Sequence, residues 1–485
     1  MGTRSETDFI GTLEIDNDAL FGIHSVRAKT NFPDTTRFHA EWYQALATVK
    51  KACYITAGDF YTKASQKLKF ENSPIKPINA EVLDSMILAA SEIEKGEHFN
   101  HFIVPAIQGG AGTSINLNIN EIIANRALQI LGAKPGQYSL IDPVEHANIF
   151  QSTNDVIPTS LKLTLIKLLA ELENSLNRLR QQVELIERQG QHQLRKAYTQ
   201  MQEAVPSSFG RLFSTYSEAL SRDWWRISRC IERIKVVNLG GSAIGSGITL
   251  PRYFVMEVVH TLQHISRQPL TRSENLYDAT SNLDSVVEVH GILKALAVNF
   301  EKMASDIRLL ASDLHQPAEL LIPQKQVGSS IMPGKVNPVI PEFAISASHR
   351  VYANDVLIGT LSAQGCLELN AYLPAIGHAA IESLKLLIAT ANTLNQNLFM
   401  GLTIQSKSAS EDLYRSASIT TALVPYLGYN KAAEIAQKMK LSQKSIFDLN
   451  LEQAFIDSKQ LQDILSPENL LKEGFSIRDL GFSDE

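Results

Sequence analysis

The sequence predicts a mainly α-helical protein organised around a bundle of long helices. The strongest observation is an apolar stripe that alternates steps of three and four residues without a break. Its members are Val286, Val289, Leu293, Leu296, Phe300, Met303, Ile307 and Leu310. Such a seven-residue repeat suits nearly parallel packing against other helices. A second stripe of the same kind follows Pro158 and consists of Leu165, Leu168, Leu172, Leu176, Leu179, Val183 and Ile186.

Two more long helices are expected at about 341–358 and 376–398, where apolar residues recur at helical spacing. Four long helices form a bundle. Several of these segments also carry leucines outside the single apolar stripe, namely Leu161, Leu163, Leu169, Leu386 and Leu387. Because a helix with more than one apolar face needs more than one partner, we expect a homo-oligomer.

Changes of composition and of element length along the chain predict three domains. Residues 1–150 are mixed in character and mostly helical, with helices expected at 41–57 and 79–94. Residues 151–405 hold the long-helix bundle. The composition then becomes more polar and the elements shorter, which predicts a small C-terminal helical domain over 406–485.

Composition limits the classes of function. The net charge of −6 comes without a basic tail or stripe, so nucleic acid is not an expected partner. The three cysteines are far apart and odd in number, which excludes a disulfide framework or a four-cysteine zinc site and fits the cytoplasm. The polar N-terminus leads to no apolar signal region, and long apolar runs are missing, so neither secretion nor membrane insertion is expected.

Residues 327–338 form a loop, because two glycines and two prolines rule out an unbroken helix or a central strand. The loop is rich in polar groups: Ser329 and Ser330 offer hydroxyls, Lys335 a cation and Asn337 an amide. We interpret it as a loop that handles a carboxylate. A surface turn with solvated side chains is an equally open reading of the loop alone.

Three other stretches share this polar, glycine- or proline-marked character. Residues 108–118 place three glycines before a helical run at 121–131, so that a helix N-terminus with Thr113 and Ser114 at its cap can bind an anion. Residues 151–159 lead into the first bundle helix, and residues 198–206 end in a proline. Their candidate side chains are Ser152, Thr153, Asn154, Thr199 and Gln200. Taken singly, the first two stretches also fit ordinary structural helix caps.

In order and approximate spacing, the four stretches resemble the signature regions of the aspartase/fumarase superfamily. The resemblance begins at Gly22-Ile23-His24-Ser25-Val26-Arg27-Ala28, passes through 238–245 and fades only over 406–485. Within the superfamily, Gly109-Gly110-Ala111-Gly112-Thr113-Ser114, the 22–24 turn and Val339-Ile340-Pro341-Glu342 look like the aspartase branch more than the fumarase branch.

The resemblance implies a three-domain fold whose long helices pack into the helical core of a homotetramer. It also implies elimination of ammonia from L-aspartate to give fumarate, through an aci-carboxylate intermediate. The resemblance implies that Ser329 is the general base. It implies that the carboxylate beside the acidic carbon is bound by Thr113, Ser152 and Thr153, and the other carboxylate by Lys335 and Asn337. Asn154 is implied to contact the amino group. Different subunits would supply these segments.

A serine base needs a stabilised alkoxide, and the loop offers backbone N–H groups freed by Gly328 and Gly334 together with the cation of Lys335. Gln200 stands where the superfamily usually has a histidine. Glutamine cannot shuttle a proton. A hydratase that expels hydroxide needs an acid, whereas ammonia leaves without one, so Gln200 counts against fumarase chemistry.

Alternatives stay open at this stage. The chain is also compatible with a fumarate hydratase, with another lyase of the superfamily that releases fumarate, or with a catalytically weak relative kept for binding or structure. His260 and His264 are four residues apart and could share a metal, but no third ligand is evident and surface histidines are far commoner. No nucleotide-binding glycine pattern follows a strand, and the elimination needs no cofactor.

Overall fold

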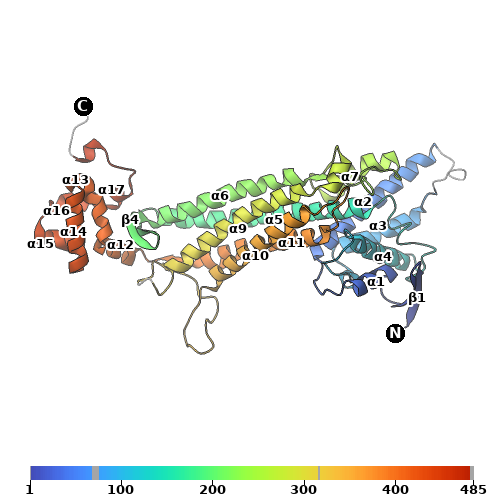
Figure 1. Ribbon diagram of the computed structural model, residues 1–485, viewed down its shortest axis with the longest axis horizontal. Coiled ribbons are helices and arrows are strands. Elements are labelled where there is room, and N and C mark those ends of the chain that lie inside the picture. The colour runs from blue at the N-terminus through green and yellow to red at the C-terminus, as the bar shows by residue number, and fades with distance from the viewer. Residues whose placement is uncertain (1, 68–75, 315–316, 481–485) are drawn as a thin grey trace. The chain divides into compact units, whose positions relative to one another are not determined.

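The computed structural model describes residues 2–67, 76–314 and 317–480, and it is mainly helical (Figure 1). The chain divides into two compact units. The first contains Met1–Leu172, Arg226–Lys294 and Arg350–Leu386. The second contains Glu173–Trp225, Ala295–His349 and Leu387–Glu485. The predicted mainly helical class is confirmed, whereas the predicted boundaries at 150 and 405 stay a prediction.

Both units share long helices: α5 (Thr153–Gln189), α6 (Phe209–Ile234), α9 (Asp284–Leu310), α10 (Val339–Ser362) and α11 (Leu373–Thr393). Every member of the two predicted apolar stripes is buried, which confirms the long helices at α5 and α9. Helix α5 begins at Thr153, five residues before the predicted start, and carries Pro158 inside it.

Helix α6 was not predicted. Its buried face follows helical spacing but is built from aromatic residues and a cysteine as much as from aliphatic ones: Phe209, Phe213, Tyr216, Leu220, Ile227, Cys230 and Ile234. Most of the intervening positions are charged or polar, which is the pattern of an amphipathic helix. The missed signal was therefore present in the sequence.

The first unit begins with an antiparallel hairpin of β1 (Thr3–Asp8) and β2 (Gly11–Asp16), in which Thr3 pairs with Asp16. Its helices include α2 (Ala40–Ser65), α3 (Ala80–Glu94) and α4 (Thr113–Ile130), and α2 packs against α3 and α7 (Figure 1). Shorter elements are α1 (Ile23–Asn31), the 3-10 turn η2 (Phe99–His101), α7 (Arg252–Ser266), α8 (Leu276–Ser281) and the parallel pair β5 (Val236–Val237) and β6 (Thr271–Arg272). The helices predicted at 41–57 and 79–94 are confirmed as α2 and α3.

A buried carboxylate holds the turn that precedes α1. The side chain of Glu121 on α4 accepts hydrogen bonds from the backbone N–H groups of Gly22 at 2.7 Å and His24 at 2.9 Å, and the Ser25 hydroxyl also donates to it. These are the N–H groups that lack partners within α1. Burial raises the pKa of Glu121 to about 7.

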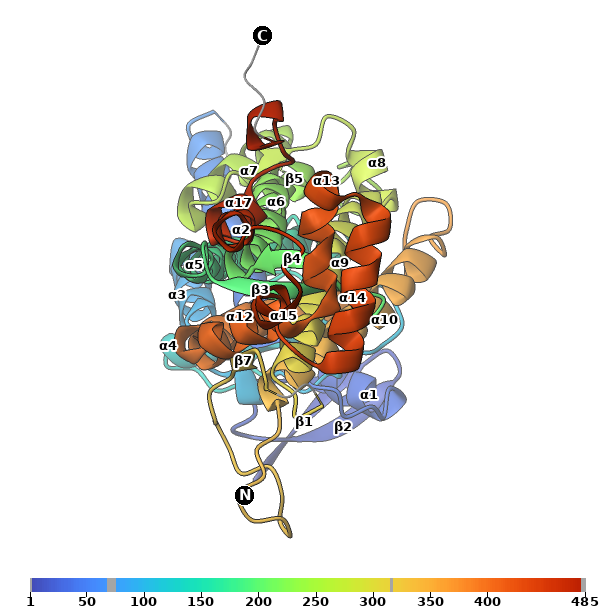
Figure 2. The same ribbon diagram turned by 90° about the vertical axis from the view of Figure 1, so that its left-hand side faces the viewer.

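The second unit contains the hairpin of β3 (Leu194–Thr199) and β4 (Gln202–Ser208) and the short antiparallel pair β7 (Leu320–Leu321) and β8 (Thr403–Ile404). Its C-terminal part is helical: η3 (Leu394–Leu398), η4 (Phe399–Gly401), α12 (Ser406–Arg415), η5 (Ala417–Leu423), α13 (Val424–Leu427), α14 (Tyr429–Ser442), α15 (Ile446–Gln453), α16 (Ser458–Ile464), α17 (Pro467–Leu471) and η6 (Ile477–Leu480). Helices α12 to α17 and η5 gather around one apolar cluster that includes Leu413, Ile435 and Leu461 (Figure 2).

Candidate active site

The glycine-rich stretch forms a left-handed turn at the start of α4. Gly110, Ala111 and Gly112 have φ angles of +83°, +56° and +92°, a region that favours glycine. Thr113 is the first residue of α4, and its exposed hydroxyl donates to the Gly110 carbonyl at 2.8 Å. Within the described residues the N–H of Ser114 has no acceptor. This helix end therefore keeps a free donor for an anion.

The polar stretch before α5 forms a second helix N-terminus beside the first. The hydroxyl of Ser152 accepts the N–H of Asn154 at 3.2 Å and so caps the helix. The hydroxyl of Thr153 accepts Nδ2 of Asn116, a residue of α4, at 3.2 Å. Because the two positive helix ends lie together, their combined dipoles favour a carboxylate. The structure thus brings together the five candidate residues of the first unit.

A buried lysine supports both helix ends. Lys50 on α2 is fully buried, and its Nζ donates to Asn116 Oδ1 at 2.6 Å and to Gln151 Oε1 at 2.8 Å. Burial lowers the pKa of Lys50 to about 7. Since Asn116 also contacts Thr153, the lysine holds the start of α4 and the start of α5 in one network. The sequence interpretation did not assign Lys50, whose only signal is a cation in the apolar run of the predicted helix at 41–57.

The β3–β4 hairpin presents Thr199 and Gln200 at its exposed tip. Gln200 and Met201 form the two-residue turn and have φ angles of +52° and +60°, as a hairpin turn of this length requires. Side chains other than glycine, asparagine and aspartate rarely adopt this conformation, so the turn is strained. The hairpin turn accounts for these angles, and the assignment of Gln200 to the site stays a prediction.

The Ser329 loop closes on itself. Gly328 donates its N–H to the Lys335 carbonyl at 2.9 Å, and Asn337 Nδ2 donates to the Gly328 carbonyl at 2.7 Å. A Cβ on Gly328 would lie 2.7 Å from the Lys335 carbonyl oxygen, so only glycine fits there. Gly334 adopts a φ of +78° at the opposite end.

The hydroxyl of Ser329 accepts two backbone hydrogen bonds, from the N–H groups of Met332 at 2.9 Å and Ile331 at 3.2 Å. Donors aimed at an oxygen favour its negative form. The sequence interpretation expected backbone donors here. The donors are the N–H groups of Ile331 and Met332, whereas Gly328 and Gly334 shape the loop.

Lys335 and Asn337 line a hollow of about 770 Å³ together with Met201 at the hairpin tip. Lys335 is exposed, and within the described residues its ammonium forms no ion pair. A buried ion pair between Arg195 on β3 and Glu319, the residue before β7, measures 2.6 Å and ties the hairpin to the base of the loop. Of the five candidate residues of the second unit, Lys335 and Asn337 line this hollow, whereas Ser329, Thr199 and Gln200 do not.

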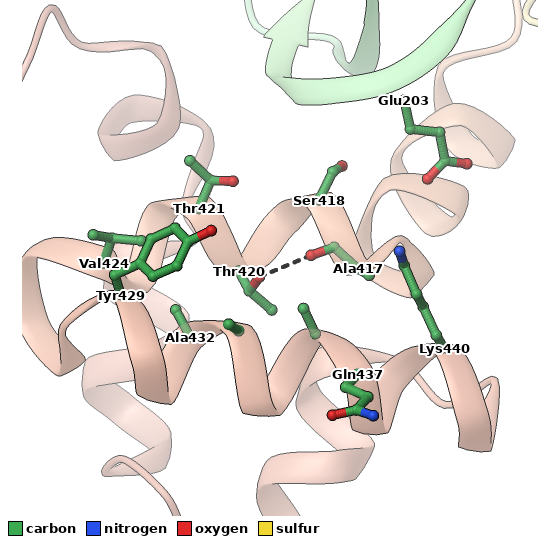
Figure 3. A pocket seen from close by; sticks show the side chains of 12 residues that line it. Glu203, Ala417, Ser418, Thr420, Thr421, Val424, Tyr429, Ala432, Gln437 and Lys440 are labelled. Carbon is green, nitrogen blue, oxygen red and sulfur yellow. Dashed lines mark hydrogen bonds between the residues drawn. The ribbon is translucent and has the colours of Figure 1, made fainter.

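A second hollow of about 470 Å³ lies between η5 and α14 (Figure 3). Alanines of α14 form its floor, Tyr429 and Thr421 stand at one end, and Lys440 and Glu203 stand towards the other. The hydroxyl of Thr420 is already engaged by the Ala417 carbonyl at 2.8 Å. The hollow contains none of the predicted site residues.

Among the described residues, one group has the spacing of metal ligands: atoms of Glu92, Glu97 and His98 lie within 4.8 Å of one another. Arg126 already pairs with both carboxylate oxygens of Glu92, at 2.6 and 2.8 Å. A resident guanidinium occupies the position that a metal cation would need. His260 and His264, considered from the sequence, lie on α7.

Comparison with known families covers most of the chain. A family model described as "Lyase" matches residues 11–353, and one described as "Fumarase C C-terminus" matches residues 419–472. The aspartate ammonia-lyase of Bacillus subtilis is 36% identical over 479 residues, which are 98% of each chain. That of Escherichia coli K12 is 33% identical over 480 residues, covering 98% of this chain and 97% of the relative.

Solved structures agree with the sequence comparisons. The cobalt-bound crystal structure of a fumarate lyase:delta crystallin protein from Brucella melitensis has a TM-score of 0.89 at 33% identity and covers 97% of this chain and 100% of that one. The class II fumarase of Schistosoma mansoni has a TM-score of 0.85 at 24% identity, covering 96% and 98%, and shows the shared fold.

The long-helix fold and these matches place the chain in a class of lyases that release fumarate. The chain belongs to the aspartase/fumarase superfamily. Its substrates are therefore dicarboxylates. Residues Leu373–Gly401 are long and apolar enough to cross a membrane, but 67% of the most apolar window is buried, as in the core helix of a soluble enzyme.

Proposed function

We propose that the protein is an aspartate ammonia-lyase that converts L-aspartate to fumarate and ammonia. The observation that carries the proposal is the Ser329 hydroxyl, which accepts the N–H groups of Ile331 and Met332 in a loop that also presents Lys335. These donors would stabilise a serine alkoxide as a general base. Curated aspartate ammonia-lyases at 33–36% identity over nearly the full length support the same assignment.

The remaining residues have roles that follow from their chemistry. Ser329 would remove a proton from the carbon beside one carboxylate, and the resulting aci-carboxylate would be stabilised by the α4 and α5 helix ends with their hydroxyls. Preorganised donors of this kind commonly make the greatest contribution to lowering such a barrier. Lys335 and Asn337 would hold the other carboxylate, and Asn154 would contact the amino group. The C–N bond then breaks and ammonia leaves without an acid, which is compatible with Gln200.

We also propose that the active enzyme is a cytoplasmic homotetramer in which different subunits supply the two groups of residues. Exposed apolar side chains on the shared helices favour association, among them Val298 (51% exposed) on α9 and Val356 (66% exposed) on α10. Dilution should then reduce specific activity in parallel with dissociation, because oligomers follow mass action. Light scattering and activity measured on the same dilution series would check this.

The substrate is tested by incubating the purified protein separately with L-aspartate, L-malate, argininosuccinate and adenylosuccinate. Fumarate formation is followed by its ultraviolet absorbance. We expect fumarate from L-aspartate alone. Fumarate from another of these substrates would replace aspartate in the proposal, and no fumarate from any of them would exclude the lyase activity.

A further inference from the structure

The amide of Asn154 has one permitted orientation. Its Nδ2 lies 2.7 Å from the backbone carbonyl oxygen of Ala243. Because a carbonyl only accepts hydrogen bonds, the NH₂ half of the amide must face Ala243. Over the described part of the chain, no group donates to Oδ1 of Asn154. The side chain is partly exposed, so Oδ1 is an accessible acceptor at the N-terminus of α5.

The backbone of Asn154 is held by the same segment. Pro158 has no N–H, so the carbonyl of Asn154 lacks the partner that a helix normally provides four residues later. Nδ2 of Asn238 takes this place and donates to that carbonyl at 2.9 Å. Asn238 is itself fixed, because its Nδ2 also donates to the Thr280 hydroxyl at 2.9 Å. Segment 238–243 therefore holds Asn154 at its main chain and at its side chain.

Asp155 fixes the segment in turn. Its two oxygens accept the N–H of Ser152 and the N–H of Ser242, both at 2.9 Å, and the residue is fully buried. Ser242 adopts a φ of +57°, which a serine does not favour without such support. A Cβ on Gly245 would lie 2.5 Å from the backbone of Leu276, so the chain has no room to shift there. The carboxylate thus locks a strained segment against the start of α5.

We propose that Asp155 is a positioning residue that acts through segment 238–243 to hold the oxygen of Asn154 towards the substrate, where it accepts a hydrogen bond from the ammonium group. An ammonium has only donors, and a flipped amide would oppose it with two more donors. A hydroxyl can donate or accept, so it tolerates either orientation. This inference rests on the proposed aspartate activity.

The test measures recognition of the amino group separately from recognition of the carboxylates. In a Ser329→Ala background, which prevents turnover, calorimetry compares the affinities for L-aspartate and for succinate, the dicarboxylate without an amino group. Adding Asp155→Asn leaves one acceptor oxygen for two N–H groups. We expect about tenfold weaker binding of L-aspartate, the size of one lost charge-assisted hydrogen bond, with succinate affinity changed less than about twofold.

Equal losses for both ligands, or no loss for either, would overturn the positioning role. If the Ser329→Ala parent binds L-aspartate no more tightly than succinate, the positioning role would also be overturned. Binding of succinate in that case would still support a dicarboxylate site. A parent that binds neither ligand would count against the proposed function itself.

A second pair of variants keeps the test decisive if Asp155→Asn does not fold. Ser242→Gly suits the positive φ, whereas Ser242→Val places a β-branched side chain where it is strongly disfavoured. We expect the glycine variant to match its parent and the valine variant to lose L-aspartate selectively. Indistinguishable affinities in the two variants would contradict the role of the segment.

Discussion

The helix-end group of the first unit and the Ser329 loop of the second are built in opposite ways. Ser152 and Thr153 are bonded to side chains from buried parts of the fold, Asp155 and Asn116, and Lys50 stands behind them. In the described structure most hydrogen bonds of the loop over 328–337 run within the loop, and the Asn337 carbonyl also accepts the N–H of Val339 at the start of α10. The first group is held by buried side chains, and the second is held mainly by its own hydrogen bonds.

The difference matches two tasks of the proposed ammonia elimination. Helix ends fixed by a buried network suit a carboxylate that has to be held in one place, because the donors do not reorganise when charge develops. An exposed loop with its own internal shape suits a base that must meet the substrate and then release the product. Substitutions in the loop should therefore change turnover, whereas substitutions behind the helix ends should change stability.

The largest expected effect lies in the loop. Ser329→Ala should lower kcat about 10³-fold, the range typical of losing a general base, while the thermal unfolding midpoint stays unchanged. Ser330→Ala is the matched control, since this neighbouring hydroxyl is exposed and has no assigned role. Stopped assays with L-aspartate and differential scanning calorimetry measure the two quantities. Near-parent turnover in Ser329→Ala would remove it from the role of base.

The next effect lies behind the helix ends. Lys50→Met should reduce the free energy of unfolding by about 3 kcal/mol, because buried amide oxygens and the buried Asp155 lose their cation. Urea denaturation measures it. Lys51→Met is the control: its partly exposed ion pair with Glu94, 3.0 Å long, should contribute no more than about 1 kcal/mol. Equal free energies of unfolding for the two variants would contradict the view that a buried network anchors the helix ends.

Lys335→Met should raise KM for L-aspartate and lower kcat/KM about 10²-fold, the cost of one charge-assisted contact to a carboxylate, with stability unchanged. Lys325→Met, which removes another exposed lysine from the same segment, should behave like the parent. Initial-rate kinetics over a substrate series distinguishes them. If both variants lose activity equally, the effect would belong to the general field of the loop and not to a clamp on the carboxylate.

The smallest effect is a pH dependence of the anchored unit. Burial raises the pKa of Glu121 from 4.5 to about 7, so its protonated form stabilises the fold below pH 4.5 and this contribution is lost as the pH rises to about 7. Relative to Glu121→Gln, the parent should lose stability across that window and stay level above it. Urea denaturation at several pH values checks this, with the exposed Glu81→Gln as control. A constant difference from pH 4 to 8 would show that Glu121 does not titrate there.

The long helices were predictable because a buried helix face requires apolar residues at every third or fourth position of the sequence. Each residue of the stripe from Val286 to Leu310 is buried, so the spacing alone located α9. Helix α6 escaped because aromatic residues and Cys230 interrupt the aliphatic pattern. The start of α5 was predicted too late, because a proline usually marks a helix boundary. In the structure Pro158 lies inside the helix, and the side chain of Asn238 donates to the Asn154 carbonyl in place of the missing N–H.

The candidate site was predictable only in its surface groups. Motifs pointed to Ser329, Lys335 and Ser152, which are local features of loops and helix caps. Lys50 and Asp155 act on residues brought close by folding, and neighbours in the sequence do not reveal such partners. Gln151, for example, lies 101 positions from the lysine that donates to it.

The self-closing loop also bears on how such a protein can be altered. Its shape depends on Gly328, on the positive φ of Gly334 and on hydrogen bonds among residues of the loop itself. A loop of this kind can be considered for exchange as one unit. We expect that residues 327–338 can be exchanged between relatives as one piece, and that the chimaera would show the turnover of the protein that supplied the loop.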